Sequence, residues 1–497
     1  MAEQLHPEGR TLTIEGVSIT APGLSGAVSV HYPGGAGLRG ADQATSELLT
    51  ALQGAGVWEQ LTIEIADPVE APAAPTLTTR STSRGDPAIE LELPGPGTGL
   101  GQVLLASDED GILSWHLPDD IAPGEQVARG EDRRRYTIRR QVVADPEGGA
   151  RGLIGAIGKK ILKVLVFDLV DRVAGEVSDF FVRRWETANR PHRLRGIEPG
   201  TFASASAPDL DEAGLARLVE GRALLFVHGT ASRCNSAFGR LPDAVIERLS
   251  SHYGGRVAGF DHPTIGFSPT ENATWFAGRL ADLGAALDVD IVAHSRGGLV
   301  ARVLAERQGA VGVTPGGLRV GTIVFVATPN AGTALADFDR LGRLVDNLTN
   351  LLELIPDNPI TDPLEVILSV VKQLAVGAFK GLDGLASMTP GGSYLGEFLN
   401  VASATDTTYR AIASDFEPAA NAALARLARD MATDAIFREQ ANDLVVPTVG
   451  VYTKNGSSRF PIDEPLVLGA GESIDHSSFW VHPSVHDAFE RWLPGST

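Results

Sequence analysis

The chain has 497 residues, of which 43% are hydrophobic, so it is long enough for two or three globular domains with a large buried core. Its 42 basic and 62 acidic residues give a net charge of −20, which opposes binding to nucleic acid and to anionic membranes. The one cysteine, Cys234, excludes a disulfide within the chain, and the first residues lack the basic region and apolar core of a secretory signal, so we expect a cytoplasmic protein, with signal-independent export left open.

Residues 1–145 are predicted to form a β-rich domain, either a sandwich or a barrel. Apolar and polar residues alternate over residues 12–19, 61–65 and 89–93, and Gly-Pro clusters separate these runs. No group of catalytic residue types occurs in this region, so we expect it to dock or position rather than to catalyse. Any protein or membrane-surface partner is expected to bind through residues 1–187.

A connecting amphipathic helix and a linker are expected over residues 146–200. Apolar side chains recur at helical spacing from 152 to 187, but charged residues such as Lys163 and Asp168 interrupt them too often for a transmembrane segment. Two interpretations remain open for this helix. It either packs between domains, which the phenylalanines and valines favour, or lies on a lipid surface.

Residues 201–497 are predicted to form an α/β domain with a mostly parallel sheet. Residues 223–227 are a continuous apolar run, as expected of a parallel strand that is buried on both faces, and they end in His228-Gly229-Thr230. Residues 320–326 are a second such run, followed by Ala327-Thr328-Pro329-Asn330-Ala331-Gly332. Helical patterns over 341–355 and 364–379 then predict an insertion after this strand.

Between these two strands, residues 289–300 read V-D-I-V-A-H-S-R-G-G-L-V. An apolar run ends at His294-Ser295, and helical apolar spacing begins after Arg296. A strand, a sharp turn and a helix in this order hold the central residue in a strained backbone geometry, which requires small residues on both sides. Ala293 and Gly297 supply them, so we expect Ser295 to be exposed at the carboxyl edge of the sheet.

This stretch resembles the nucleophile elbow of the α/β-hydrolase superfamily, in the form found among bacterial lipases and esterases, with Ala293 in place of the usual first glycine. The H-G-T segment resembles the oxyanion loop of these enzymes, and the A-T-P segment resembles their lipase branch. The resemblance covers residues 220–495. It implies an α/β-hydrolase domain with helices on both faces of the sheet, a helical cap at about 333–405, and no metal or organic cofactor.

A serine hydroxyl is a weak nucleophile at neutral pH and needs a base that is oriented by a carboxylate. The chain order in the resembled fold is serine, acid, histidine, which leaves only His476, His482 and His486 as the base. His476 follows the apolar run 465–469 by a short loop, whereas the other two lie at or within the predicted terminal helix. We therefore expect His476 to be the base.

The acid is expected to be Asp443, because Asn442-Asp443-Leu444-Val445-Val446-Pro447 resembles the acid loop of lipases. Asp415, at the end of the predicted strand 409–413, is the competitor. The resemblance also implies an oxyanion site made of the backbone amides of Thr230 and Arg296, for which neither side chain is needed.

Four further residues are expected to support the turn and the oxyanion loop: His228, Gly229, His294 and Gly297. The resemblance thus implies a serine hydrolase that cleaves carboxylic esters of acyl or lipid type through an acyl-serine intermediate. The alternative within the enzyme class is a phospholipase or a thioesterase. The resemblance also leaves open a role as a membrane-attacking effector. The non-enzyme alternative is a docking protein with a degenerate hydrolase fold.

Overall fold

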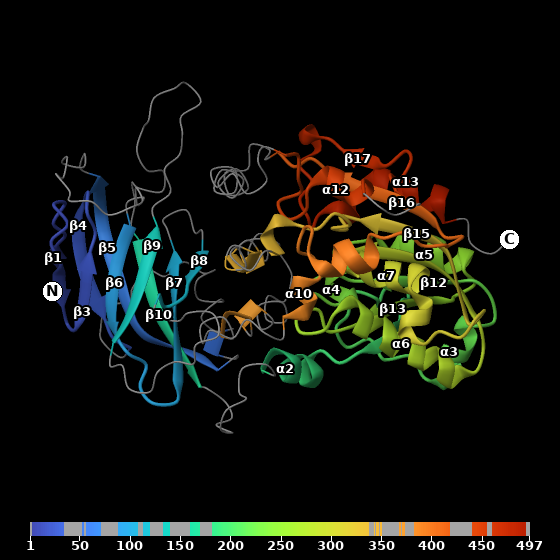
Figure 1. Cartoon of the computed structure of the whole chain (residues 1–497), viewed down its shortest axis with the longest axis horizontal. Helices are drawn as coiled ribbons and strands as arrows, with labels where there is room; N and C mark the ends of the chain where they lie inside the picture. The colour runs from blue at the N-terminus through green and yellow to red at the C-terminus, as the bar shows by residue number, and fades with distance from the viewer. Residues whose placement is uncertain are drawn as a thin grey trace. The chain divides into compact units, whose positions relative to one another are not determined.

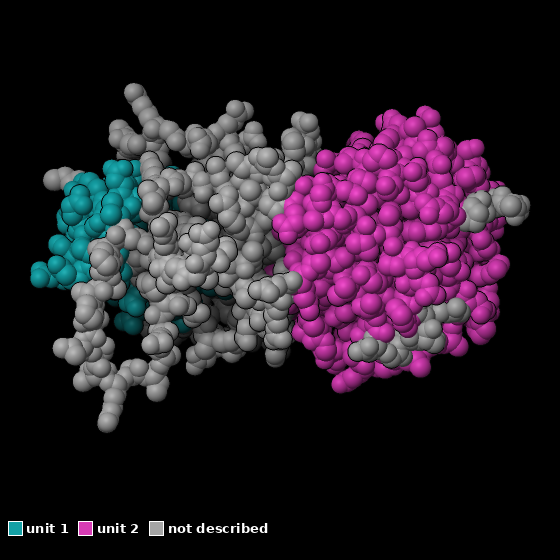
Figure 2. Space-filling model, turned by 90° about the horizontal axis from the view of Figure 1, so that it is seen from above, with its two compact units in different colours: residues 1–179, 345–379, 422–435 teal, residues 180–344, 380–421, 436–497 magenta. Residues whose placement is uncertain are grey.

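The computed structural model describes residues 2–33, 52–53, 56–70, 88–107, 113–119, 133–139, 160–168, 181–336, 382–417, 440–454 and 460–493, with eleven further residues between 342 and 372. The chain divides into two compact units (Figure 2). Unit 1 comprises Met1–Asp179, Val345–Phe379 and Ala422–Ala435. Unit 2 comprises Phe180–Leu344, Lys380–Asn421 and Ile436–Thr497.

Unit 1 contains two antiparallel sheets, visible as the blue to cyan strands of Figure 1. The larger sheet has the order β1-β4-β5-β10-β7-β8 and the smaller one β2-β3-β6-β9. The strands are β1 (Glu3–Gln4), β2 (Leu12–Ile14), β3 (Val17–Thr20), β4 (Leu24–His31), β5 (Val57–Glu70), β6 (Ala88–Pro94), β7 (Leu100–Ser107), β8 (Leu113–His116), β9 (Arg133–Arg139) and β10 (Lys160–Asp168). Buried residues of both sheets, among them Val17, Ile63 and Leu91, form one apolar core. The β-rich N-terminal region expected from the alternating pattern is therefore confirmed, as a two-sheet sandwich.

The prediction of a connecting helix within residues 146–200 is wrong for residues 160–168, which form β10. Lys160–Asp168 is a strand between β5 and β7, with Val164 opposite Leu61 on one side and Leu104 on the other. Every residue from Leu162 to Phe167 is buried. A strand that is buried on both faces shows no alternation, so its apolar spacing cannot be separated from that of a buried helix. Within the described residues of this range, only α2 (Phe181–Asn189) is helical.

Part of the insertion that we expected to cap the α/β domain belongs to unit 1. Asp346 Oδ1 accepts a hydrogen bond from the backbone N–H of Trp115 at 2.7 Å, and Thr349 Oγ1 accepts one from Trp115 Nε1 at 3.2 Å. Both bonds attach the insertion to β8 of the sandwich. Most of the two helices predicted over 341–379 lies outside the described residues.

Unit 2 contains a seven-stranded sheet of the order β11-β13-β12-β14-β15-β16-β17. The strands are β11 (Arg193–Gly196), β12 (Ala223–Val227), β13 (Val257–Asp261), β14 (Leu287–His294), β15 (Leu318–Val326), β16 (Thr408–Ser414) and β17 (Leu466–Leu468). Only β11 runs antiparallel to its neighbour, and the six other strands are parallel. The carboxyl ends of six strands therefore meet at one edge of the sheet.

Helices cover both faces of this sheet (Figure 1). The helices are α2, α3 (Glu212–Leu218), α4 (Cys234–Phe238), α5 (Asp243–His252), α6 (Pro269–Leu283), α7 (Gly297–Glu306), α10 (Asp383–Ala386), α12 (Thr448–Tyr452) and α13 (Pro483–Trp492), with the 3₁₀ turns η1 (Gln308–Val311), η2 (Ala334–Ala336), η5 (Ala470–Glu472) and η6 (Phe479–Val481) and the π-helix η4 (Tyr394–Leu399). Helices α4, α5 and α13 share a core with one face, while α6 and α7 pack together on the other. This topology confirms the predicted α/β-hydrolase fold class. No helix in the described ranges combines the length and the apolar character that crossing a membrane requires.

Candidate active site

Ser295 lies in the sharp turn between β14 and α7. Its φ of +52° falls in the left-handed region that non-glycine residues seldom adopt. Its backbone N–H donates to the carbonyl of Val326 at 2.9 Å, which ties the turn to β15. Two glycines make room for it. A Cβ on Gly297 would lie 2.3 Å from the carbonyl oxygen of Val227, and a Cβ on Gly229 would lie 2.5 Å from the Cβ of Ser295.

Three of the residues singled out in the sequence form one chain of hydrogen bonds. His476 Nδ1 lies 2.8 Å from Asp443 Oδ2, and His476 Nε2 lies 2.9 Å from Ser295 Oγ. Because a carboxylate only accepts, Nδ1 carries the proton and Nε2 is left to accept from the serine hydroxyl. All three side chains are buried. The arrangement can therefore take a proton from the hydroxyl as its oxygen attacks an electrophile.

The loop 442–447 sets the position of Asp443. Its Oδ1 accepts hydrogen bonds from the backbone N–H groups of Val445 and Val446 at 3.0 and 2.7 Å, so that only Oδ2 faces the imidazole. The backbone N–H of His476 donates to the carbonyl of Asp443 at 2.9 Å, which locks the two loops together. Asp415, the competing acid, follows β16 and makes no hydrogen bond to His476 among the described residues.

The two other candidate histidines lie elsewhere. His482 precedes α13 and pairs with Glu472 at 3.0 Å, and His486 Nε2 donates to the carbonyl of Trp480 at 2.7 Å. Neither imidazole contacts Ser295 in the described part of the chain.

Two buried histidines flank the turn and stay neutral. His294 Nε2 donates to the backbone carbonyl of His476 at 2.9 Å, and burial lowers the pKa of His294 to about 3. His228 donates through Nδ1 to the carbonyl of Gly229 at 2.9 Å and accepts at Nε2 from the backbone N–H of His262 at 3.0 Å. Burial lowers its pKa to about 4. Both side chains therefore act as fixed hydrogen-bonding groups rather than as charges.

The backbone amides of Thr230 and Arg296 flank the serine from the two loops that meet there. Thr230 follows Gly229, and Arg296 follows Ser295 at the start of α7. Over the described ranges neither amide donates to a protein acceptor. Two N–H groups that are fixed in place and have no protein partner are suited to receive a developing negative charge.

The side chain of Arg296 is fully buried and has partners of its own. Its Nε donates to the carbonyl of Gly384 at 3.0 Å and its Nη2 to that of Phe267. Burial lowers its pKa to about 10, and the nearby Glu186 opposes this shift. The guanidinium thus remains charged at neutral pH and joins two loops next to the turn.

The insertion also reaches this site through its second half. Met388 Sδ lies 3.9 Å from Thr230 Oγ1, and the Met388 carbonyl accepts from the backbone N–H of Thr333 at 2.9 Å. Gly384 lies so close to the loop after β13 that a Cβ there would be 2.1 Å from the Thr264 carbonyl oxygen. Residues 382–388 therefore lie beside the oxyanion loop.

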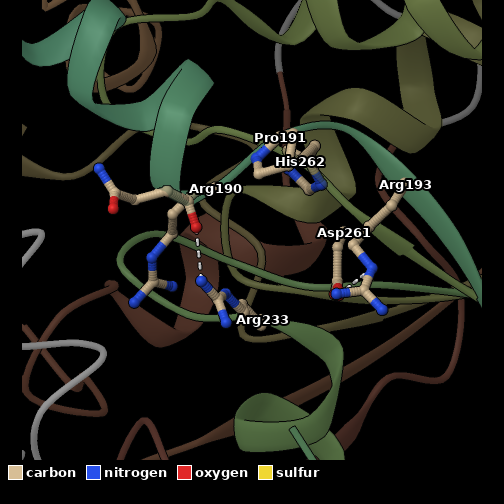
Figure 3. Close-up of a pocket in the computed structure, with 7 residues that line it drawn as sticks. Arg190, Pro191, Arg193, Arg233, Asp261 and His262 are labelled. Carbon is tan, nitrogen blue, oxygen red and sulfur yellow. Dashed lines mark hydrogen bonds and ion pairs between the residues drawn. The ribbon is translucent and has the colours of Figure 1, made fainter. Parts of the chain in front are cut away.

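A separate small cavity of about 30 Å³ opens near the carboxyl ends of α2 and β13 (Figure 3). It is lined in part by Arg190, Pro191, Arg193, Arg233, Asp261 and His262. Asp261 Oδ2 lies 3.9 Å from Arg193 Nε. None of the residues around this cavity belongs to the Ser295, His476, Asp443 chain.

Comparisons with known proteins identify a matching family and several solved structures that are similar to this chain. A family described as a domain of unknown function, DUF7379, matches residues 189–494, and no curated protein matches the chain. A mature lipase from Bacillus licheniformis is similar in structure, with 18% identity, 61% of this chain and 98% of that chain covered, and a TM-score of 0.37. A putative α/β-hydrolase family protein from Desulfitobacterium hafniense has 15% identity, 61% and 99% coverage, and a TM-score of 0.33. Lipase 1 from Pelosinus fermentans has 15% identity, 56% and 99% coverage, and a TM-score of 0.34.

Sequence reasoning missed the residues that brace the site. Glu186, on α2, and the Arg296 side chain both hold the loop after β13, although they are distant from it in sequence. The one sequence signal for Glu186 was its place among apolar residues at helical spacing. A glutamate at the edge of the apolar face is common on surface helices, so this signal does not indicate a buried carboxylate.

Proposed function

The match to DUF7379 covers residues 189–494, more than half of this chain, so the chain belongs to that family. We propose that it is a serine hydrolase of carboxylic esters, of lipase or esterase type. The observation that carries the proposal is the hydrogen-bond chain from Ser295 through His476 to Asp443, in a strained turn at the carboxyl edge of the sheet. Strain at a nucleophile is expected where geometry must be fixed before reaction.

The proposed reaction follows from the positions of the protons. As Ser295 Oγ attacks the ester carbonyl, its proton passes to His476 Nε2, and Asp443 stabilises the resulting imidazolium. The carbonyl oxygen becomes negative and is received by the amides of Thr230 and Arg296. The imidazolium then protonates the leaving alcohol. In the second half the imidazole takes a proton from water as the water oxygen attacks the acyl carbon. The imidazolium then returns the proton to Ser295 Oγ as the acyl–serine bond breaks and the acid leaves.

A phospholipase and a thioesterase would use the same machinery on another acyl bond, so the substrate class needs its own measurement. We expect oxygen esters to be hydrolysed faster than matched thioesters. Apolar pockets gain about 0.8 kcal/mol for each buried methylene, so a panel of esters from two to sixteen carbons should reveal the pocket length as a break in kcat/KM. Preference for a phospholipid or a thioester over this panel would replace the lipase or esterase assignment.

The test of the mechanism is covalent labelling. A fluorophosphonate probe should label the wild-type chain and fail to label Ser295→Ala, and His476→Ala should be nearly as inactive because the members of such a site act as a unit. The His486→Ala variant is the matched control, since that imidazole lies away from the serine, and it should keep its labelling. Labelling that survives Ser295→Ala would refute the proposal.

A further inference from the structure

Helix α2 precedes every strand of the unit 2 sheet in the sequence, yet it is hydrogen-bonded to a loop at the carboxyl edge of that sheet. We call residues 263–268, which join β13 to α6, the bridging loop. Glu186 of α2 is fully buried. Its Oε1 accepts from the backbone N–H groups of Thr264 and Ile265 at 2.7 and 2.9 Å, and its Oε2 accepts from that of Gly266 at 2.8 Å. One carboxylate thus fixes three consecutive peptide units.

A second side chain of α2 holds the same loop from outside. Arg183 Nη1 donates to the carbonyl of Gly266 at 2.6 Å, and the guanidinium lies 4.2 Å from the ring centroid of Phe267. Arg183 also pairs with Glu271 in the first turn of α6. Hydrogen bonds to charged groups are the stronger class, so this end of the bridging loop has little freedom.

The bridging loop is in turn bonded beside both amides proposed to receive the oxyanion. Thr264 Oγ1 accepts from the backbone N–H of Ala231, the residue after Thr230, at 3.1 Å. The carbonyl of Phe267 accepts from the guanidinium of Arg296, whose own backbone amide is the second proposed donor. The carboxylate of Glu186 and the buried guanidinium of Arg296 also attract one another.

The carboxyl end of α2 is bonded to residues 232 and 233, which follow the oxyanion loop, and Figure 3 shows the bond at Arg233. Arg233 Nη2 donates to the carbonyl of Asn189 at 2.6 Å, and Arg190 Nη1 donates to the carbonyl of Ser232 at 3.1 Å. Ser232 Oγ donates to the carbonyl of Gly229 at 2.9 Å. Both loops that border the proposed oxyanion site are therefore tied to one helix.

We propose that α2 is a positioning element of the active site, in which Glu186 fixes the bridging loop and so the amides of Thr230 and Arg296. The inference rests on the proposed function, because it assigns Glu186 to the oxyanion site of that reaction. Donors that stabilise an oxyanion must lie within a few tenths of an ångström of its position, and loss of one such donor costs about 10² to 10³ in turnover. Glu186 acts through these amides and touches no reacting atom.

The test compares Glu186→Gln with wild type in the full-length chain. The amide oxygen can still accept, but the NH₂ group faces a backbone N–H, so one of the three loop amides loses its acceptor. We expect kcat to fall about 10- to 100-fold with KM nearly unchanged. The affinity for a trifluoromethyl ketone, which mimics the tetrahedral intermediate, should fall by the same factor as kcat/KM. Glu212→Gln, an exposed glutamate on α3, is the matched control and should behave as wild type.

Thr264→Val is the second variant, in case the first fails to fold. It keeps the side-chain shape and removes the hydroxyl that accepts from Ala231. A purely structural role would lower the melting temperature while kcat and ketone affinity of the folded enzyme stayed at wild-type values, and that result would overturn the inference. Fluorophosphonate labelling of Ser295→Ala would refute the proposed function, whereas wild-type kcat and ketone affinity in the Glu186 and Thr264 variants would refute only the role of α2. The two outcomes are therefore distinguishable.

Discussion

Asp443 is bound on both carboxylate oxygens, and each bond has a different consequence for catalysis. The two loop amides on Oδ1 set the carboxylate plane, while Oδ2 alone orients His476. Asp443→Asn should leave the fold intact but reduce turnover by about 10⁴, because an amide nitrogen can stabilise the wrong tautomer of the imidazole. Steady-state kinetics with circular dichroism would check this. Asp415→Asn is the matched control, and a collapse of activity there with normal turnover in Asp443→Asn would reverse the assignment.

The buried neutral histidines predict how stability depends on pH. Burial lowers the pKa of His228 to about 4 and that of His294 to about 3, whereas the unfolded chain has ordinary imidazoles near pH 6.5. Below pH 6.5 the unfolded state therefore binds protons that the folded state does not. Stability is complete above pH 6.5 and should fall by about 1.4 kcal/mol per pH unit for each histidine as the pH drops towards 4.

This pH dependence can be measured by denaturant unfolding of unit 2 between pH 7.5 and 5. The variant His228→Gln removes one titrating group, so its stability should fall less steeply with decreasing pH. The variant His252→Gln, on the exposed end of α5, should keep the wild-type slope. Equal slopes in wild type and His228→Gln would contradict a neutral buried His228.

At the scale of the residue, sequence predicted those parts of the site whose backbone geometry demands particular residue types. Ser295, Gly229 and Gly297 are recognisable because only small neighbours permit the turn. Glu186 and the side chain of Arg296 could not be predicted in this way. Their partners are backbone carbonyls and amides, which every residue carries, so no residue type in the bridging loop marks the contact.

At the scale of the element, strands that are buried on one face were predicted well. Strands that are buried on both faces were harder to distinguish from helices. Strand β3, which lies within the predicted run 12–19, alternates between buried and half-buried residues. Strand β10 is buried on both faces and was taken for a helix. In unit 2 the doubly buried strands β12 and β15 were nevertheless recognised, because turn motifs with known chemistry follow them.

The central position of β10 predicts its hydrogen-exchange behaviour. Its amides are paired with β5 on one side and β7 on the other, so they should open only when the sandwich unfolds as a whole. We expect peptides from Lys160–Asp168 to be among the slowest in unit 1, and peptides from the edge strand β1 to be much faster. Exchange mass spectrometry measures both in one sample. Rapid exchange over 160–168 would favour the helical linker instead.

At the scale of the whole molecule, the sequence predicted the α/β fold but placed β11, a strand of its sheet, in a linker and assigned the insertion to one unit alone. The contacts of Trp115 with Asp346 and Thr349 lie more than 200 residues apart in the sequence, and no local pattern records such a pairing. Amphipathic helices after β15 indicated a covering role, but periodicity does not say which surface is covered.

The insertion should therefore stabilise the sandwich. Asp346→Ala leaves the backbone N–H of Trp115 without its acceptor, and a buried unsatisfied donor costs about 1 to 3 kcal/mol. The loss should appear in the unfolding free energy of unit 1 by urea titration. Asp119→Ala, which removes a hydrogen bond to the Thr137 hydroxyl at the surface, is the control and should cost less than 1 kcal/mol. Equal stability of the Asp346 variant and wild type would contradict the assignment.

The assignment of Val345–Phe379 to unit 1 has a consequence for synthesis on the ribosome. Chains emerge from the amino end, so strands β1 to β10 leave the exit tunnel long before Asp346 and Thr349 do. By then β11 to β15, most of the other sheet, have already been translated. The sandwich therefore lacks the partners of Trp115 while the first strands of unit 2 are being synthesised. For the time needed to translate more than 200 codons, the backbone and indole N–H groups of Trp115 therefore lack the acceptors that Asp346 and Thr349 later provide.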